Sequence, residues 1–493
     1  MSYQVPQHID KNKVFIVNRS EIDGRIDPHY YKPEYIELYS LLKSLKCNLS
    51  TLKEESYAIF SGITPKSGGD AYSSEADAIP FVRSGDFSDT NTIDFSKLLY
   101  LKPEVHNGIM SASQLKKNDL LIAIVGATIG KVGIYLYDRD ANINQAICGV
   151  RLKEYINPLF VQAFYQTSIG QKIIERTKRP VARANLNLEE VGQFPIPIVD
   201  KIIQEKIIGI FQKGIDKKKQ KEIEAQKLLN SIAPYLLNEL GIILPNENYG
   251  LEKRIFYISS SECVDKRIDP KKYSPKTKDL YLAIENSLYP KYSLVSFIVD
   301  SCSGDWGSDG EVDIVPSGWT KCVVLRGTEI DNMYNLSICQ EKVKKRLIQT
   351  DKFKKIQPLL NDIIIEKSGG SDDQPVGRVA IVDLENFNNI PLSFSNFLMK
   401  IRVKGIDANY LYYYLKTIYN IGGTDSMQSQ TNGIRNLIIK EYLEQKVVVP
   451  SLEKQQEISN HIAEMRLMAK RLQEEGESIL ENAKKEVEQM ILG

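Results

Sequence analysis

The chain repeats itself at a long interval, and this repetition constrains its architecture more than any single motif. Five short segments occur twice in the same order: Arg25-Ile26-Asp27-Pro28 and Arg267-Ile268-Asp269-Pro270, Asn118-Asp119 and Asn361-Asp362, Gly130-Lys131-Val132 and Gly377-Arg378-Val379, Ala184-Asn185-Leu186 and Arg435-Asn436-Leu437, Gln204-Glu205 and Gln456-Glu457. The spacing between partners grows slowly, from about 242 to about 252 residues. Conserved order with drifting spacing indicates a duplicated unit with small loop insertions.

A chain of 493 residues is too long for one hydrophobic core. The first part of each unit contains short aliphatic runs, such as residues 120–125 and 362–365, that are separated by Gly, Asn and Asp clusters. We therefore predict a mixed α/β (α+β) globular domain at residues 1–200, a long helix at 201–240, a second globular domain at 241–450 and a second long helix at 451–493.

Both predicted helices carry an apolar stripe. Apolar residues in the first follow steps of three and four, and those in the second repeat every seven residues from Ile458 to Ile479, which is typical of a coiled coil. Pro234 is expected to kink or end the first helix. Basic residues outnumber acidic ones over 201–240 and the reverse holds over 452–493, so we expect the helices to pair antiparallel with each other. The alternative is that each helix packs only on its own globular domain.

The signatures of common enzymes are missing from the sequence. There is no Gly-x-Gly turn or Pro-Pro element of a DNA methyltransferase, and Gly126–Val132 departs from a phosphate-binding loop in both spacing and its last residue. The six cysteines include no CxxC pair, there are four histidines, and no apolar run is long enough to span a membrane. We expect a cytoplasmic protein without a catalytic centre, metal or bound cofactor of its own.

Cations and amides gather at equivalent places of the two units. Arg, Asn and Gln suit the edges of guanine and adenine, whereas Lys suits phosphate, and Gly-rich turns let backbone amides approach phosphate. A solvated loop is the alternative for these segments. The predicted DNA-binding residues are Lys66, Arg83, Lys131, Lys178, Arg179, Arg183 and Asn185 in the first unit, and Arg326, Lys367, Arg378, Gln428, Gln430, Asn432 and Arg435 in the second.

Several of these segments resemble a known family. The segments are Gly62–Pro65 with Ala78–Asp86, Asn118–Ile122 leading into Gly126–Val132, Ala184–Leu188 with Pro195–Pro197, and in the second copy Ser303–Gly307, Gly377–Val379 and Pro450 with Gln455-Gln456-Glu457. They are similar to the specificity subunit of type I restriction–modification enzymes. The second copy departs by a longer turn at Gly369–Gly377, so contacts there do not transfer one to one.

The resemblance implies two target recognition domains, each reading half of a split double-stranded DNA site, with the helices fixing the unread gap. It also implies partners: methylation subunits, two of them expected, and restriction motor–nuclease subunits. S-adenosylmethionine, ATP and Mg would then be bound by those partners. The alternatives are the recognition subunit of a system whose partner fuses methylation with cleavage, a stand-alone DNA nuclease, and a coiled-coil scaffold that does not contact DNA.

Overall fold

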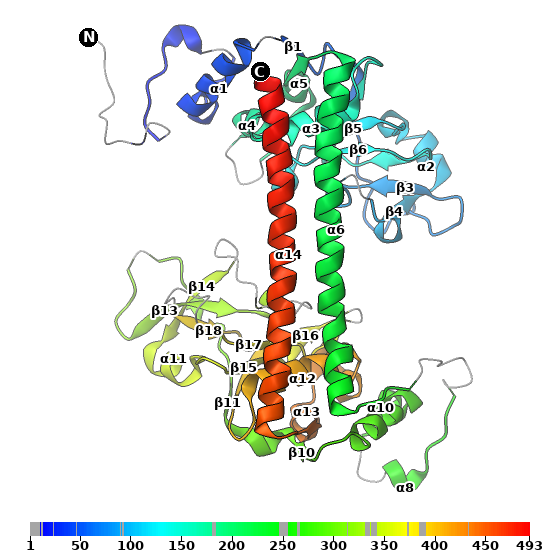
Figure 1. Ribbon diagram of the computed structural model, residues 1–493, viewed down its shortest axis with the longest axis vertical. Coiled ribbons are helices and arrows are strands. Elements are labelled where there is room, and N and C mark those ends of the chain that lie inside the picture. Colours follow the sequence, from blue (N-terminus) through cyan, green and yellow to red (C-terminus); the bar gives the residue numbers. More distant parts are fainter. Residues whose placement is uncertain are drawn as a thin grey trace. The chain divides into compact units, whose positions relative to one another are not determined.

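The polypeptide of the computed structural model passes from one unit to another through a long helix and returns through a second one (Figure 1). The structure describes residues 10–493 except 11–12, 23, 46, 89, 91–92, 180–183, 246–254, 264–266, 313, 331–335, 337–342, 372–373, 384–390 and 432. Unit 1 comprises Met1–Ile223 and Leu472–Gly493, and unit 2 comprises Glu224–Arg471. In the described part of the chain, no helix combines the length and apolarity that crossing a bilayer requires.

Unit 1 is built on a four-stranded antiparallel sheet with smaller sheets and helices around it. The main sheet has the order β2-β8-β5-β6, with β2 Ser56–Ser61, β8 Ile147–Leu152, β5 Asp119–Ala123 and β6 Val132–Tyr135. A second sheet, β4-β3-β7, consists of Leu99–Leu101, Ile79–Val82 and Asn142–Ile143, and a strand pair joins β1 Asn48–Thr51 to β9 Pro195–Ile198. The helices are α1 Pro33–Lys43, α2 Pro103–Asn107, α3 Pro158–Tyr165, α4 Ser168–Thr177 and α5 Leu188–Gly192.

Among the described residues, unit 2 repeats this topology and adds one strand and one further sheet. Its main sheet, β11-β19-β15-β17, consists of Ile298–Ser303, Leu398–Val403, Ile363–Glu366 and Val379–Ile381. The others are β12-β14-β13-β18 (Ser308–Asp309, Lys344–Gln349, Trp319–Leu325, Leu392–Phe394), β10-β22 (Lys291–Ser293, Lys446–Val448) and β16-β21-β20 (Ser368–Gly370, Ile434–Leu437, Gln428–Thr431). Its helices are α8 Ser260–Cys263, α9 Pro270–Tyr273, α10 Pro275–Glu285, α11 Thr350–Ile356, α12 Ala408–Asn420 and α13 Ile439–Glu444. The predicted duplication and the mixed α/β fold are confirmed.

The repeated Asn-Asp pair lies at the start of β5 and β15, where its two residues have separate structural roles. Asn118 and Asn361 have positive φ angles of 73° and 68°, which Asn tolerates better than most residues. The following Asp119 is buried and accepts hydrogen bonds of 2.8 and 2.7 Å from Arg151. Each unit thus begins its central strand with a tight turn and a buried ion pair.

One of the predicted correspondences is shifted by a residue. The side chain of Gln204 accepts a 2.9 Å hydrogen bond from the backbone of Asn157. Its structural counterpart is Gln455, which accepts a 2.8 Å bond from the backbone of Asp407, whereas the predicted partner Gln456 is exposed. Gln204 and Gln455 are equivalent because both are buried and both accept a backbone hydrogen bond from the start of a helix. The shared Gln-Glu dipeptide does not identify the equivalent residues.

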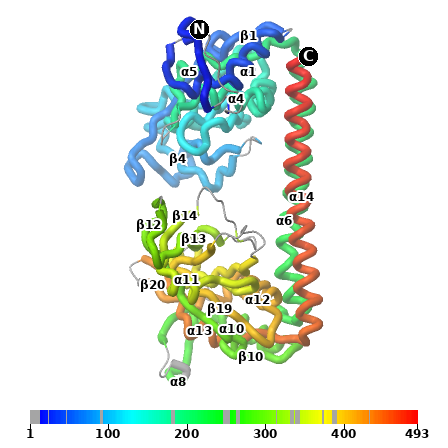
Figure 2. Tube along the Cα trace, turned by 90° about the vertical axis from the view of Figure 1, so that its left-hand side faces the viewer, coloured from blue at the N-terminus to red at the C-terminus, as the bar shows by residue number. Residues whose placement is uncertain are grey.

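The long helices α6 Lys201–Leu240 and α14 Leu452–Leu492 lie side by side in both views (Figures 1 and 2). In unit 1, Lys221 of α6 forms a 2.9 Å ion pair with Glu475 of α14. In unit 2, Glu239 forms a 2.7 Å ion pair with Lys454. The partners run in opposite directions, so the antiparallel pairing and its charge complementarity are confirmed. Pro234 does not end α6, which continues to Leu240.

The helices also belong to the cores of the units. The largest core of unit 1 combines Phe211 and Ile215 of α6 with Leu480, Val487 and Ile491 of α14, together with the main sheet and α3–α4. Ser168 of α4 donates a 2.7 Å hydrogen bond to Glu488. Pairing between the helices and packing on the globular domain therefore occur together and are not alternatives.

Candidate nucleic-acid interface

Three of the segments predicted to bind DNA in unit 1 are joined through backbone hydrogen bonds. The parallel pair β3–β7 ends at Val82 and Ile143, and the amide of Asn144 donates to the carbonyl of Val82 over 3.2 Å. The amide of Ile124 donates to Ala146 over 2.9 Å, and that of Leu186 donates to Ile124 over the same distance. Segments 83–86, 144–146, 124–126 and 184–186 thus form one continuous surface, the loop edge of unit 1.

Unit 2 builds the same surface with the same bonds. The amide of Ser395 donates to Leu325 over 2.8 Å, the amide of Lys367 donates to Phe397 over 2.9 Å, and that of Leu437 donates to Lys367 over 2.8 Å. Segments 326–329, 395–397, 367–370 and 435–437 form the loop edge of unit 2. Gly126 and Gly369 turn the chain at equivalent points with φ angles of 76° and 101°, a conformation that favours glycine.

The arginine at the start of each loop edge closes its own turn. The guanidinium of Arg83 donates to Asp86 over 2.8 and 3.0 Å, and Asp86 also accepts the amide of Arg83 over 2.9 Å. Hydrogen bonding to Asp86 raises the pKa of Arg83. Arg326 and Glu329 repeat the arrangement with a 2.7 Å ion pair. The arginine side chains remain 39% and 31% exposed, so each combines a structural bond with an accessible guanidinium face.

The loop that carries Lys66 lies next to the loop edge of unit 1. The hydroxyl of Thr64 donates to the side chain of Gln145, and the hydroxyl of Tyr72 donates to the carbonyl of Pro65 over 3.1 Å. Lys66 itself is exposed. Asn185 is also exposed and pairs with Val125 in an isolated bridge.

The other predicted cations of unit 1 occupy different surroundings. Lys131 is half-buried at the start of β6. Lys178 pairs with Glu175 at 3.3 Å, and Arg179 pairs with Glu190 at 2.6 Å. Arg183 lies outside the described residues.

In unit 2 the structure gathers several predicted residues around a shallow pocket of about 290 Å³. Gln430 and Arg435 pair across β20–β21 and line the pocket with Arg267, Asp269 and Lys271. Gln430 is exposed and Arg435 half-buried. On the same loop edge, Lys367 donates a 2.8 Å hydrogen bond to Ser303. Asn432 is not among the described residues.

Arg378 and Gln428 are held inside unit 2. Arg378 is 6% exposed, forms bonds of 2.6 and 2.9 Å with Glu366, and donates to the carbonyls of Gly327 and Ile330. Gln428, also 6% exposed, donates to Val376 and Thr424. A buried guanidinium needs such partners. A buried amide that faces inward cannot contact DNA at the surface of the unit. We therefore leave both residues out of the interface proposed below.

The structure adds surface residues that the sequence pattern did not single out. Gln145 in unit 1 and Asn396 and Phe397 in unit 2 are exposed at the centre of the loop edges, and Phe397 is 51% exposed. These residues follow strands of only two and three residues. Strands this short cannot be recognised from the sequence, and neither can the turns that follow them. The sequence offered only a Phe among polar residues as a signal, and its exposure is known from the structure alone. Among the residues with a described position, no three His, Cys, Asp or Glu side chains are grouped to hold a metal ion.

Comparison with known proteins gives a family match over both units. The model of the type I restriction modification DNA specificity domain matches residues 64–227 and 324–474. The EcoBI type I restriction enzyme specificity subunit of Escherichia coli is 31% identical over 124 residues, which is 25% of this chain and 25% of that protein. The match thus spans about a quarter of the relative's length.

Two solved structures align with most of the chain. The S subunit of a type I restriction–modification system from M. genitalium is 13% identical, with 91% of this chain and 96% of that one covered and a TM-score of 0.36. A chain from a type I restriction–modification system solved for its assembly and conformational transition is 12% identical, with 90% and 96% covered and a TM-score of 0.45.

Proposed function

Because this chain belongs to the type I restriction modification DNA specificity family, we propose that it is the DNA sequence-specificity subunit of a type I restriction–modification complex. Each unit reads one half of a bipartite double-stranded DNA target through its loop edge. The chain itself carries out no reaction. It selects the site on which other subunits act.

The observation that carries this proposal is that the two loop edges share one backbone but differ in their exposed side chains. Unit 1 presents the exposed Lys66, Gln145 and Asn185, whereas unit 2 presents the exposed Phe397 and Gln430 beside the half-buried Arg435. Amides and guanidinium groups discriminate base edges, cations bind phosphate, and an aromatic ring contacts the thymine methyl group. Two equal frames with different surfaces suit two half-sites of different sequence.

The helices α6 and α14 supply a spacer between the readers. Their pairing buries an apolar seam in both units, and ion pairs such as Lys221–Glu475 fix its register. A rod of two helices resists bending better than a loop linker, so the unread gap of the target would be constant. This role supports a split site of fixed spacing.

The reaction belongs to partners in this proposal. Two methylation subunits would bind S-adenosylmethionine, and motor–nuclease subunits would bind ATP and Mg. The complex would act in the cytoplasm of a prokaryotic cell, where its DNA lies.

The test is to assemble the full chain with the methylation subunits of the same system and sequence the methylated DNA. Two short motifs separated by a constant gap are expected, and a variant of unit 2 such as Arg435→Ala should change only one of them. Methylation at one uninterrupted motif would contradict the proposal. Cleavage of DNA by the purified chain alone with Mg would instead favour an enzyme.

A further inference from the structure

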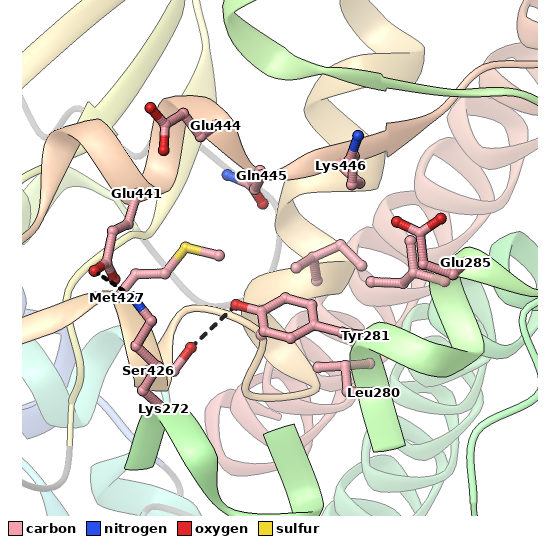
Figure 3. Close-up of a pocket in the computed structure, with 13 residues that line it drawn as sticks. Lys272, Leu280, Tyr281, Glu285, Ser426, Met427, Glu441, Glu444, Gln445 and Lys446 are labelled. Atoms are coloured by element: carbon pink, nitrogen blue, oxygen red, sulfur yellow. Dashed lines mark hydrogen bonds and ion pairs between the residues drawn. The ribbon is translucent and has the colours of Figure 1, made fainter. Parts of the chain in front are cut away.

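A pocket of about 280 Å³ opens in unit 2 between α10, the end of α12 and α13, away from the loop edge (Figure 3). Its floor is apolar, with Leu280, Ile284, Ile418 and Met427. The ring of Tyr281 stands in it, with its hydroxyl 3.1 Å from that of Ser426. Tyr281 as a whole residue is 37% exposed, so the pocket is accessible to a side chain from outside.

Unit 1 fills the same place with its own residues. The backbone of Phe194 accepts a 3.0 Å hydrogen bond from Leu52, and the backbone of Gln445 accepts the same bond from Leu294, so Phe194 and Gln445 are equivalent. The Phe194 ring is 1% exposed and packs on Tyr165 at 6.0 Å. Gln445 leaves the space open, because its amide turns to the carbonyl of Tyr442.

A guanidinium also lies in the unit 1 site. Helices α1 and α10 both have eleven residues and begin with Pro, which makes Tyr39 the counterpart of Tyr281. The guanidinium of Arg176 lies 3.9 Å from the ring centroids of both Tyr39 and Tyr30. Within the described part of unit 2, no cation stacks on Tyr281.

Three glutamates and two lysines, Lys272 and Lys446, line the open pocket, so its carboxylates outnumber its cations by one. Glu441 is paired with Lys272 at 2.8 Å. Glu285 and Glu444 line the same pocket, and neither forms an ion pair with a described residue. An aromatic face, an apolar floor and carboxylates at the rim suit a long side chain with an apolar stem and a flat cationic head.

We propose that this pocket receives an arginine side chain of a partner protein subunit, in the role that Arg176 plays within unit 1. The inference rests on the proposed function in so far as it takes the partner to be a subunit of the same complex. The arginine stem would pack on Met427 and Ile284, its guanidinium would stack on Tyr281, and Glu285 and Glu444 would accept its hydrogen bonds. This docking pocket would be present in unit 2 only, because Phe194 fills the equivalent place in unit 1.

The first test uses ethylguanidinium as the probe and the methyl resonance of Met427 in the full chain as the signal. A saturable shift is expected at roughly millimolar concentration. Gln445→Phe, which copies Phe194, should abolish the shift, and Glu285→Gln with Glu444→Gln should weaken binding at least about tenfold. Thermal unfolding of each variant checks that unit 2 remains folded.

Butylammonium and benzyl alcohol serve as competing probes. The proposal fails if ethylguanidinium gives no saturable shift, if the shift persists in Gln445→Phe, or if either competitor binds equally well. Binding of benzyl alcohol alone would identify an apolar occupant instead.

The second test measures assembly with purified methylation subunits of the same system. Gln445→Phe is expected to weaken assembly at least about tenfold, while the motif methylated by the remaining complex stays unchanged. Equal assembly of the variant and the parent chain would reject the arginine pocket and leave the specificity function intact. If the complex of the parent chain methylates no bipartite motif, the proposed function is rejected. The ethylguanidinium titration would still show whether the pocket binds a guanidinium group.

Discussion

Gly214 of α6 faces Ala483 of α14 so closely that a methyl group on Gly214 would lie 2.7 Å from the Cβ of Ala483. The Cα of Leu480 lies 3.8 Å from the same point. A backbone and a Cβ atom cannot move aside as a long side chain can. The close approach of the two helices in unit 1 therefore depends on glycine at this position.

We expect Gly214→Ala to destabilise the chain by about 1–3 kcal/mol, because overpacking outweighs the higher helix propensity of alanine. Urea unfolding followed by circular dichroism measures the change. Gly209→Ala in the same helix is the matched control, since nothing lies within 4 Å of its added methyl group. That control should gain about 0.5–1 kcal/mol. Equal effects of the two substitutions would show that the helices do not pack as described.

Asp362 anchors the centre of unit 2 by accepting bonds of 2.7 and 2.8 Å from Arg402. Lys400, 2% exposed in its side chain, lies 3.7 Å from the same carboxylate. Asp362→Ala leaves these cations only the partly exposed Asp300, 3.2 Å from Lys400, as a carboxylate partner, and is expected to cost about 3–5 kcal/mol in the free energy of unfolding. Asp351→Ala, at an exposed position in α11, should cost less than about 1 kcal/mol. If Asp362→Ala lowers the free energy of unfolding no more than Asp351→Ala does, the buried ion pair contributes little to stability.

Arg435→Ala is expected to weaken specific DNA binding by about 1–3 kcal/mol if the side chain reads a base. Fluorescence anisotropy of the assembled complex, on cognate and scrambled DNA, measures the change. Lys404→Ala is the control, because Lys404 is exposed directly after Val403, the end of β19 opposite to the loop edge. Unchanged affinity and sequence preference in Arg435→Ala would place this part of the loop edge off the DNA.

A matched insertion of one heptad into both long helices, after Lys219 in α6 and after Glu474 in α14, should lengthen the unread gap. Seven helical residues add about 10.5 Å, which corresponds to about three base pairs. Methylation sequencing should return both half-sites unchanged at the wider spacing. An insertion of two residues at the same places turns the following residues by about 200°, which breaks the apolar seam and is expected to abolish methylation. If the gap stays constant after the heptad insertion, the long helices do not set the spacing between the half-sites.

The sequence predicted most of the architecture because the features that define it are local and occur twice. The turn at Asn118 and Asn361 needs a residue that tolerates positive φ. Apolar stripes mark the long helices, with an interruption between Ile215 and Ala225 of α6. The prediction was wrong for Gln456, because a dipeptide match carries no information about which amide is buried. Of the two effects expected of Pro234, the end of the helix was wrong, because α6 continues to Leu240.

The candidate interface was less accessible to sequence reasoning. Arg83 and Arg378 are both arginines beside glycines, yet one is partly exposed and the other is buried against Glu366. That difference depends on strands distant in the sequence. Phe397 escaped notice for the opposite reason, since a single aromatic residue in a turn resembles a core residue until its exposure is known.

The core of unit 1 includes Leu480, Val487 and Ile491, and this has a consequence for how the protein is made. A ribosome synthesises the sheets of unit 1 more than 250 residues before it reaches these core residues. Unit 1 therefore completes its packing only after unit 2 has been synthesised and α14 has emerged. A frameshift between unit 2 and Leu480 would damage the recognition domain that precedes unit 2.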